Sequence, residues 1–115
     1  MVSATVQQIA QQNDQFRQGD PNIPGQRFIT MGINELLKRL EVPPEELAQQ
    51  VTEFAEFTED NDPHQEHDFG GFKFHGHKCF WKIDYYDRDY SMGSDDPSDL
   101  TKTNRLLTIM LADEW

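Results

Sequence analysis

Three groups of side chains in this sequence could carry acid–base or metal chemistry. The densest lies in NDPHQEHDFGGF, residues 61–72, and consists of Asp62, His64, Glu66, His67 and Asp68. Carboxylates and imidazoles bind divalent metals, and a metal held by them can activate water for phosphodiester hydrolysis. However, the adjacent Glu66-His67 pair differs from the helical two-histidine signature of zinc proteases. The other interpretation is an ordered loop, in which an Asx-type turn begins a set of side-chain hydrogen bonds to loop amides.

A second acidic group follows a predicted strand and contains Asp84, Asp87 and Asp89. We expect residues 69–86 to form a β-hairpin, whose antiparallel strands would place the end of the second strand beside the start of the first. One alternative for the protein is therefore a small metal-dependent hydrolase or nuclease that uses Asp62 with four further residues: Glu66, His67, Asp84 and Asp87. Its metal ligands would come from a smaller set: Asp62, His64 and His67. The pattern alone assigns none of them a catalytic or metal-binding role.

The third group contains two imidazoles and a thiol, in His75, His77 and Cys79. These ligands would share one side of a strand only if no turn intervened, and Gly76 predicts a turn between them. A structural zinc ion also needs four ligands, and no fourth is evident. We therefore interpret Cys79 as a small buried apolar residue and expect no cofactor.

The elements that must position these groups are predicted to form one domain over residues 1–115. Apolar side chains at helical spacing, with Ser3 or Thr5 as N-cap, predict an N-terminal helix within residues 1–18 that could lie at the periphery. The next expected elements are a strand near 27–31, a helix near 34–41, and a helix that starts at Pro43 and Pro44 and ends near Phe57.

The predicted hairpin has a core side and an outer side in its second strand. Alternation directs Cys79, Trp81, Ile83 and Tyr85 to one side and Phe80, Lys82, Asp84 and Tyr86 to the other, and the first side is the better core candidate. Residues 103–112 are apolar enough for a helix or a strand, and their flanking residues favour a helix. Arg105 is expected to form a structural ion pair with one of the acids. Together the elements predict an α+β fold, with a small, mostly antiparallel sheet covered by two to four helices.

Negative charge is the strongest feature of the composition. The chain carries 21 acidic and 10 basic residues, for a formal net charge of −11. Direct binding to nucleic acid is disfavoured, because that binding depends on Lys and Arg side chains that replace counterions on phosphates. A basic partner is favoured instead, although the charge could also serve only to keep the protein soluble.

The sequence also bounds the compartment. No apolar run approaches the roughly 20 residues that span a bilayer, and MVSATVQQIAQQ lacks the features of a signal peptide, so we expect no membrane association. The single cysteine excludes an internal disulfide framework and agrees with a reducing compartment. These observations predict a cytoplasmic protein.

Three blocks, NDPHQEHDFGGF, FWKIDYYDRD and RLLTIMLADEW, resemble the signature blocks of an uncharacterised proteobacterial family of domains of unknown function. Members of that family are small acidic proteins encoded on plasmids and integrated mobile elements near antirestriction genes. The resemblance covers residues 27–115, and the N-terminal helix and INELLKRLEVPP fit it less well. It implies no catalytic residue, and genomic setting supports a function by association only.

Clustered charge and this setting lead to the principal hypothesis, a non-enzymatic acidic interaction protein from a mobile element. It would inhibit a host defence system by blocking the nucleic-acid-binding groove of a basic protein, as an anti-CRISPR or antirestriction DNA mimic. Residues 59–70 contain five acids and residues 94–100 contain three, with no Lys or Arg in either stretch. The expected partner-binding residues are Glu59, Asp60, Asp62, Glu66, Asp68, Asp87, Asp89, Asp95, Asp96 and Asp99. Besides the hydrolase, a further alternative is an accessory protein that binds one cognate partner through an apolar patch.

Overall fold

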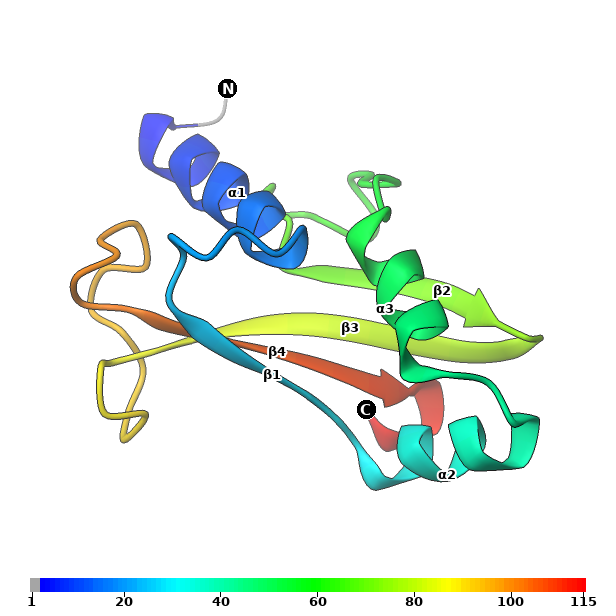
Figure 1. Cartoon of the computed structure of the whole chain (residues 1–115). Coiled ribbons are helices and arrows are strands. Elements are labelled where there is room, and N and C mark those ends of the chain that lie inside the picture. The colour runs from blue at the N-terminus through cyan, green and yellow to red at the C-terminus, as the bar shows by residue number, and fades with distance from the viewer. Residues whose placement is uncertain (1–2) are drawn as a thin grey trace.

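A computed structural model describes residues 3–115 as helices packed on a four-stranded sheet (Figure 1). The elements are α1 (Ala4–Arg17), β1 (Gly25–Ile29), α2 (Met31–Leu40), α3 (Pro44–Thr52), β2 (Phe69–Phe74), β3 (His77–Tyr86), β4 (Asn104–Leu111) and the 3-10 turn η1 (Ala112–Glu114). The strand order is β1-β4-β3-β2, with β1 parallel to β4 and the other neighbours antiparallel. The predicted α+β class and hairpin are confirmed, and the sheet is mixed. Within residues 3–115, no helix is both long and apolar enough to cross a bilayer.

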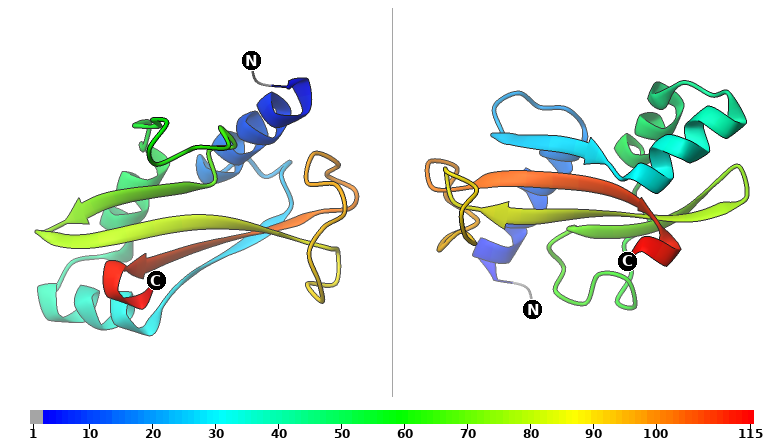
Figure 2. Two further views of the ribbon diagram at one scale, coloured as in Figure 1. Left: turned by 180° about the vertical axis from the view of Figure 1, so that it is seen from behind. Right: turned by 90° about the horizontal axis from the view of Figure 1, so that it is seen from below.

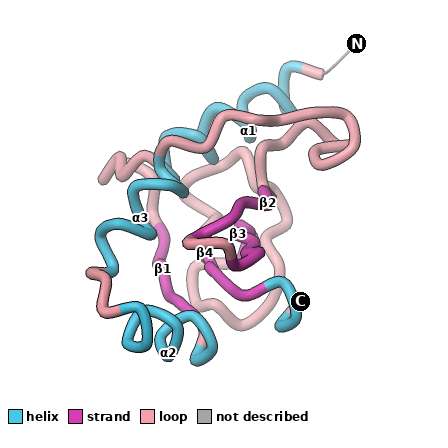
Figure 3. The backbone as a smooth tube through the Cα atoms, turned by 90° about the vertical axis from the view of Figure 1, so that its right-hand side faces the viewer, coloured by secondary structure: helices cyan, strands magenta, loops and turns pink. Residues whose placement is uncertain are grey.

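The two faces of the sheet differ in what covers them. Helices α1 and α3 lie over one face, which we call the helical face, and α2 packs beside the end of β1 (Figure 1). The end-on view in Figure 3 shows the helices arranged around one side of the strands. Seen from below in Figure 2, the strands lie in front of α1, and they are uncovered over most of their length, with α2 and the turn η1 at one end. We call this second side the open face.

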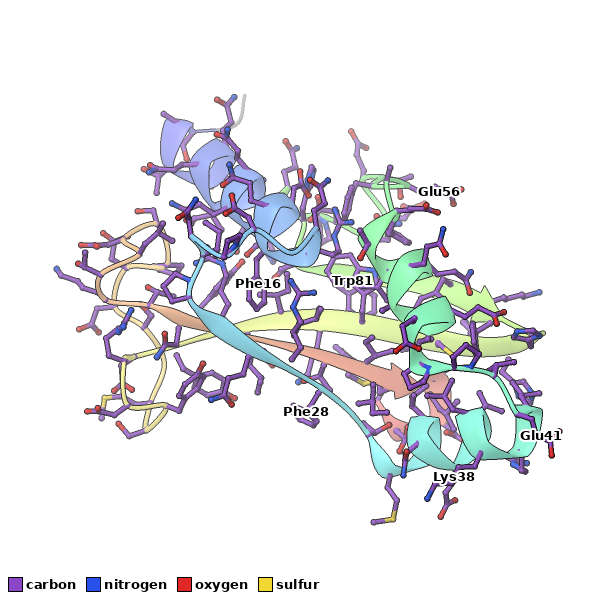
Figure 4. All side chains as sticks on the ribbon, viewed as in Figure 1. Phe16, Phe28, Lys38, Glu41, Glu56 and Trp81 are labelled. Atoms are coloured by element: carbon purple, nitrogen blue, oxygen red, sulfur yellow. The ribbon has the colours of Figure 1, made fainter. Side chains whose placement is uncertain are left out.

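The hydrophobic core fills the space between the sheet and the helices. Trp81 and Cys79 are fully buried there and Ile83 nearly so, which confirms the predicted core side of β3. In Figure 4, Phe16 and Trp81 lie between the sheet and the helices, whereas Phe28 projects on the other side. Further core residues come from α2, α3 and β4: Ile33, Leu36, Leu37, Leu47, Val51, Leu107 and Ile109.

The C-terminal segment is a strand, which decides between the helix and the strand considered for residues 103–112 and is not the favoured helix. Strand β4 lies between β1 and β3 and is buried over most of its length. A central strand that packs on both faces loses the alternation of apolar and polar residues that marks a half-exposed strand. Its run of Leu106, Leu107, Ile109 and Met110 therefore resembles a buried helix in the sequence alone.

The third helix also ends earlier than predicted, at Thr52 instead of near Phe57. Arg17, whose side chain is 2% exposed, donates from Nη1 to the carbonyl oxygens of Val51, Thr52 and Phe54 at 3.0, 3.1 and 2.8 Å. Because the last carbonyls of a helix lack partners within the helix, this guanidinium caps the C-terminus of α3 from α1. The chain after α3 can then turn away over the sheet, where the Phe54 ring packs edge-on against Trp81.

The other helices begin close to their predicted positions. The Ser3 hydroxyl accepts from the Val6 amide as N-cap of α1, as expected. Helix α2 starts at Met31, three residues before the predicted start at 34, because Thr30 and Glu114 cap it from both sides. The Thr30 hydroxyl donates to Glu114 Oε1 at 2.6 Å and accepts from the Ile33 amide, while Glu114 Oε2 accepts from the Gly32 amide. A carboxylate beside a helix N-terminus is stabilising, so η1 fixes α2 to the end of β4.

Candidate functional site

A buried polar network joins α1 to both acidic loops of the molecule. Asn13 is fully buried, and its Nδ2 donates to the Glu66 carbonyl oxygen at 2.9 Å and to the Tyr85 hydroxyl at 2.8 Å. The Tyr85 hydroxyl donates in turn to Glu66 Oε1 at 2.8 Å. Burial, together with this contact to Glu66, raises the pKa of Tyr85. Asn13 therefore fixes the segment that leads into β2 against both α1 and β3.

Arg105 extends this network to the loop between β3 and β4. Its side chain is fully buried, and it donates to Asn13 Oδ1 at 2.6 Å, to Gln12 Oε1 at 3.1 Å and to the Pro97 carbonyl oxygen at 3.1 Å. Its guanidinium also lies 5.2 Å from the centre of the Tyr85 ring. The predicted ion pair is therefore wrong, because neutral oxygens take the donors of Arg105. Desolvation by burial lowers the pKa of this guanidinium.

An open groove lies between α1 and the loop that precedes β2. Its volume is about 550 Å³, and His67, Asp14, Asp62, Phe57 and Glu59 are among its lining residues. His67 Nδ1 lies 3.0 Å from both carboxylate oxygens of Asp14, and its Nε2 lies 3.7 Å from Asp62 Oδ2. The imidazole stacks on the Phe57 ring at 3.9 Å between centroids and an interplanar angle of 3°. A histidine held between two carboxylates can accept or donate a proton in this groove.

The loop is also ordered by its own backbone contacts, as the loop interpretation predicts. Asn61 Oδ1 accepts from the Thr58 amide at 2.8 Å, and Asp62 Oδ1 accepts from the His67 amide at 3.2 Å. His67 adopts a φ of 57°, a left-handed conformation that is costly for a side chain of this size and needs surrounding contacts to hold it. Its ion pair with Asp14 and its stacking on Phe57 supply those contacts.

The alternative catalytic set is not brought together by the hairpin. Glu66 and His67 lie on the helical side, whereas Asp84 lies on the open face, where Lys82 Nζ is 3.1 Å from Asp84 Oδ2. Asp87 accepts from the Ser91 amide at 3.0 Å and hydroxyl at 2.9 Å, within its own turn. Adjacent residues of a strand point to opposite faces of the sheet. Asp84 therefore lies on the other face from Glu66 and His67, although the hairpin brings their backbone segments close together.

The alternative metal ligands converge only in part. Asp62 is 4% exposed and faces His67, whereas His64 is exposed. Over residues 3–115, no group of three His, Cys, Asp or Glu side chains is placed to share one metal ion. In the hairpin, His75 pairs with Glu46 at 2.6 Å, and Gly76 adopts the positive φ of a turn residue. Cys79 is fully buried, and burial followed by the charge of Glu114 raises the pKa of its thiol to about 11.

The loop between β3 and β4 holds its carboxylates in fixed positions. Asp99 Oδ1 accepts from the Thr101 hydroxyl at 2.6 Å and from the Thr101 amide at 2.9 Å, and these bonds lower the pKa of Asp99. Asp96 accepts in the same way from Ser98. Hydrogen bonds from Ser91 likewise lower the pKa of Asp87. These hydrogen bonds orient all three carboxylates.

The predicted partner-binding acids differ in their access to solvent. Glu59, Asp60, Asp89 and Asp95 are exposed; Glu66, Asp68, Asp87, Asp96 and Asp99 are half-buried. Asp62 is buried against His67 and is not available for a direct partner contact. Burial, followed by the charge of Glu66, raises the pKa of Asp68. The acids that a partner can reach therefore lie in two places, at residues 59–60 and at the loop between β3 and β4.

The sequence did not reveal the hydrogen-bonding roles of four residues of the site. These are Asn13, Asp14, Arg17 and Arg105. One signal was present, because Asn13 falls on the apolar stripe of α1 at the spacing of Ile9 and Phe16. A polar residue at a core position requires buried partners. The sequence did not show which segments would supply them.

Comparison with known proteins identifies the family of this chain. A family model described as a protein of unknown function, DUF3768, matches residues 29–114. No curated protein and no solved structure matches the chain. The matched region contains β2, β3, β4, α2, α3, both acidic loops and the last residue of β1, and it leaves out α1. Since the match spans most of the sequence, the chain belongs to this DUF3768 family of unknown function.

Proposed function

We propose that this chain is a non-enzymatic acidic interaction protein that occupies the nucleic-acid-binding groove of a basic protein. Solvent-accessible carboxylates in two loops beside α1 are the observation that carries the proposal. Glu59 and Asp60 lie in one loop beside α1, and Asp95 and Asp99 lie in the other. Figure 1 shows these loops, drawn in green and in orange, at the two sides of α1.

The two loops act as one surface because α1 connects them. Gln12 Nε2 donates to the Ser98 carbonyl oxygen at 2.9 Å, and Asn13 Nδ2 donates to the Glu66 carbonyl oxygen at 2.9 Å. Both loops are therefore fixed to neighbouring residues of a single helix. A partner that binds oriented carboxylates loses less side-chain entropy than one that must order flexible acids.

The charge of α3 and of the loop that follows it is of one sign. Residues 45–72 contain nine acids and no Lys or Arg. Of these, Glu53, Glu56, Glu59 and Asp60 are exposed after α3. The nearest arginine, Arg17, is buried beneath α3 and does not offset them at the surface. Such a field steers a basic groove toward the protein and repels phosphates.

The resemblance to proteins of mobile elements supports a specific kind of partner, a nucleic-acid-binding protein of a host defence system such as a CRISPR effector or a restriction enzyme. Occupying its groove would exclude DNA by competition. On this proposal the protein acts inside the cell, binds no nucleic acid itself and needs no cofactor.

The test is binding of the purified chain to a basic defence nuclease, measured by biolayer interferometry. We expect affinity to fall steeply as salt rises from about 0.05 to 0.5 M, because the contacts are exposed charges. The pair Glu59→Gln with Asp60→Asn should weaken binding about tenfold at low salt. The pair Glu35→Gln with Glu41→Gln changes net charge equally outside the surface and should have little effect. Salt-independent binding, or equal loss in both pairs, would contradict the proposal.

A second candidate function is acid–base hydrolysis in the groove beside α1, and the contact of His67 with Asp14 and Asp62 favours it. In this candidate Asp14 would orient the imidazole and Nε2 would exchange the proton. Hydrolysis of RNA or DNA by the wild type, lost in both His67→Gln and Asp14→Asn while binding of the basic nuclease persists, would replace the first candidate with this one.

A further inference from the structure

The open face of the sheet exposes large apolar side chains. Phe28 is 50% exposed and Trp115 is 70% exposed, and both line a shallow groove of about 430 Å³ across this face. The Trp115 ring lies 5.1 Å from Phe69 and 5.9 Å from Phe80, so the aromatic side chains form a continuous surface. Contiguous exposed aromatic surface of this kind marks an interaction site in soluble proteins.

Charge distinguishes the open face from the rest of the molecule. Its strand positions carry three lysines, Lys73, Lys78 and Lys82, against one carboxylate, Asp84. Glu114 lines the groove at its edge. The whole chain carries −11, whereas cations outnumber carboxylates at the strand positions of this face. Two copies of an acidic chain repel each other least where such faces meet.

The order of residues along β3 shows which partner fits. The side chains on its open face follow in the order Lys78, Phe80, Lys82, Asp84 and Tyr86. Cations and an aromatic precede Ile83, and an anion and an aromatic follow it. This strand is therefore complementary to itself when read in the opposite direction.

We propose that two copies of this chain pack open face to open face about a twofold axis. The axis passes between the two β3 strands, level with Ile83. The axis lies in the plane between the sheets, so the two β3 strands run antiparallel and contacts repeat symmetrically. Lys82 of each copy meets Asp84 of the other, and Phe80 meets Tyr86.

The dimer buries the apolar groove between two sheets, as in layered β architectures. It leaves the acids at residues 59–60 on the outside, because the segment that carries them lies on the helical side (Figure 1). The dimer and the binding of a basic partner are therefore independent, and either proposal can fail without the other.

The first test is sedimentation velocity of the full chain over about 1 to 200 µM, with concentrations chosen to bracket a micromolar dissociation constant. We expect a reversible dimer, and Phe28→Glu should raise the dissociation constant about tenfold or more. Ala48→Glu is the matched control, because Ala48 is exposed on α3, which lies over the helical face, and it should dimerise as the wild type does. Unchanged melting temperatures would show that both variants fold.

The second test reverses the charges across the twofold axis. Lys82→Glu places like charges together twice in each dimer and should weaken it. Adding Asp84→Lys to Lys82→Glu restores both pairs and should recover most of the affinity. Lys38→Glu makes the same charge change on α2 and should have little effect.

Tryptophan fluorescence reports the same surface directly. Trp81 is already fully buried, so a blue shift of emission on raising concentration would come from Trp115. A chain that stays monomeric overturns the proposal, as does a double charge reversal that fails to recover dimerisation. Quenching of Trp115 in a monomer by a thymidine oligonucleotide would also overturn it and assign the face to single-stranded nucleic acid.

Discussion

Replacing Asn13 by alanine tests whether α1 is held to the sheet by its buried polar network. The buried side chain makes three hydrogen bonds, each to a different segment. They join it to Glu66 in the loop before β2, to Tyr85 in β3 and to Arg105 in β4. Alanine fits the helix and removes no apolar packing. The change therefore isolates the polar contacts.

The expected loss follows from what the substitution leaves unpaired. Arg105 Nε loses its acceptor in a site where Nη1 already lacks a partner, which costs about 1.5 to 3 kcal/mol for a charged donor. The Glu66 carbonyl loses its donor, for about 1 to 1.5 kcal/mol more. The Tyr85 hydroxyl keeps its bond to Glu66 Oε1. Alanine returns about 0.6 kcal/mol through its higher helix propensity. The net loss is about 2 to 4 kcal/mol.

The measurement is urea and thermal unfolding followed by circular dichroism. A loss of about 2 to 4 kcal/mol should lower the melting temperature by about 8 to 16 °C in a chain of this size. Gln11→Ala, on the exposed side of the same helix, should stay within about 0.5 kcal/mol of the wild type. In an Arg105→Met background the cost of Asn13→Ala should fall toward about 1 kcal/mol, because no charged donor remains to be orphaned. A loss below about 1 kcal/mol for the single variant would refute the network.

Three further predictions concern packing, capping and the thiol. Gly70→Ala should destabilise the fold by about 1 to 3 kcal/mol, because a Cβ there would lie 2.7 Å from the Phe54 ring and against Trp81. Gly71→Ala, on the other face of the sheet, should cost less stability, and thermal melts of the two variants compare the losses. Partial burial opposes ionisation of Glu114, but hydrogen bonds from Thr30 and two backbone amides lower its pKa. The ionised carboxylate therefore stabilises the fold above the unfolded pKa of about 4.3, and this contribution is lost as the pH falls through the folded pKa. A Glu114→Gln variant should show a smaller decline in stability between about pH 5 and 3. A raised pKa of about 11 and full burial should protect Cys79 from aromatic disulfide reagents at neutral pH until the chain unfolds, and fast labelling of the native protein would contradict this.

Local sequence patterns predicted most of the helices and strands. Tertiary contacts explain the two features that the patterns missed, the strand β4 and the end of α3. The hairpin was evident because β3 alternates and Gly76 supplies its turn. Strand β4 was mistaken for a helix because a strand buried between two neighbours carries no alternation. The end of α3 was misplaced because Arg17, far away in sequence, supplies its C-terminal cap.

The site was predicted less well because its residues come from segments that only the fold brings together. The loop with Asp62 and His67 was found from residue types, but its partner Asp14 lies on α1. The hairpin was expected to place Asp84 beside this loop, and the pleat directs that side chain to the opposite face. Residue type identified candidates, and the direction of each side chain decided which of them meet.

The family match and the polar network together give α1 a definite role. The matched region begins after α1, yet Asn13 and Gln12 provide the acceptors for Arg105, which lies within that region and is fully buried. Without α1, the guanidinium of Arg105 would keep a carbonyl of the β3–β4 loop as its acceptor and lose the rest. A buried charge in that state is costly, so a chain that has Arg105 at this position needs α1 or an equivalent segment. The N-terminal helix is therefore part of the folding unit, and through its contacts to Ser98 and Glu66 it sets the spacing of the two acidic loops.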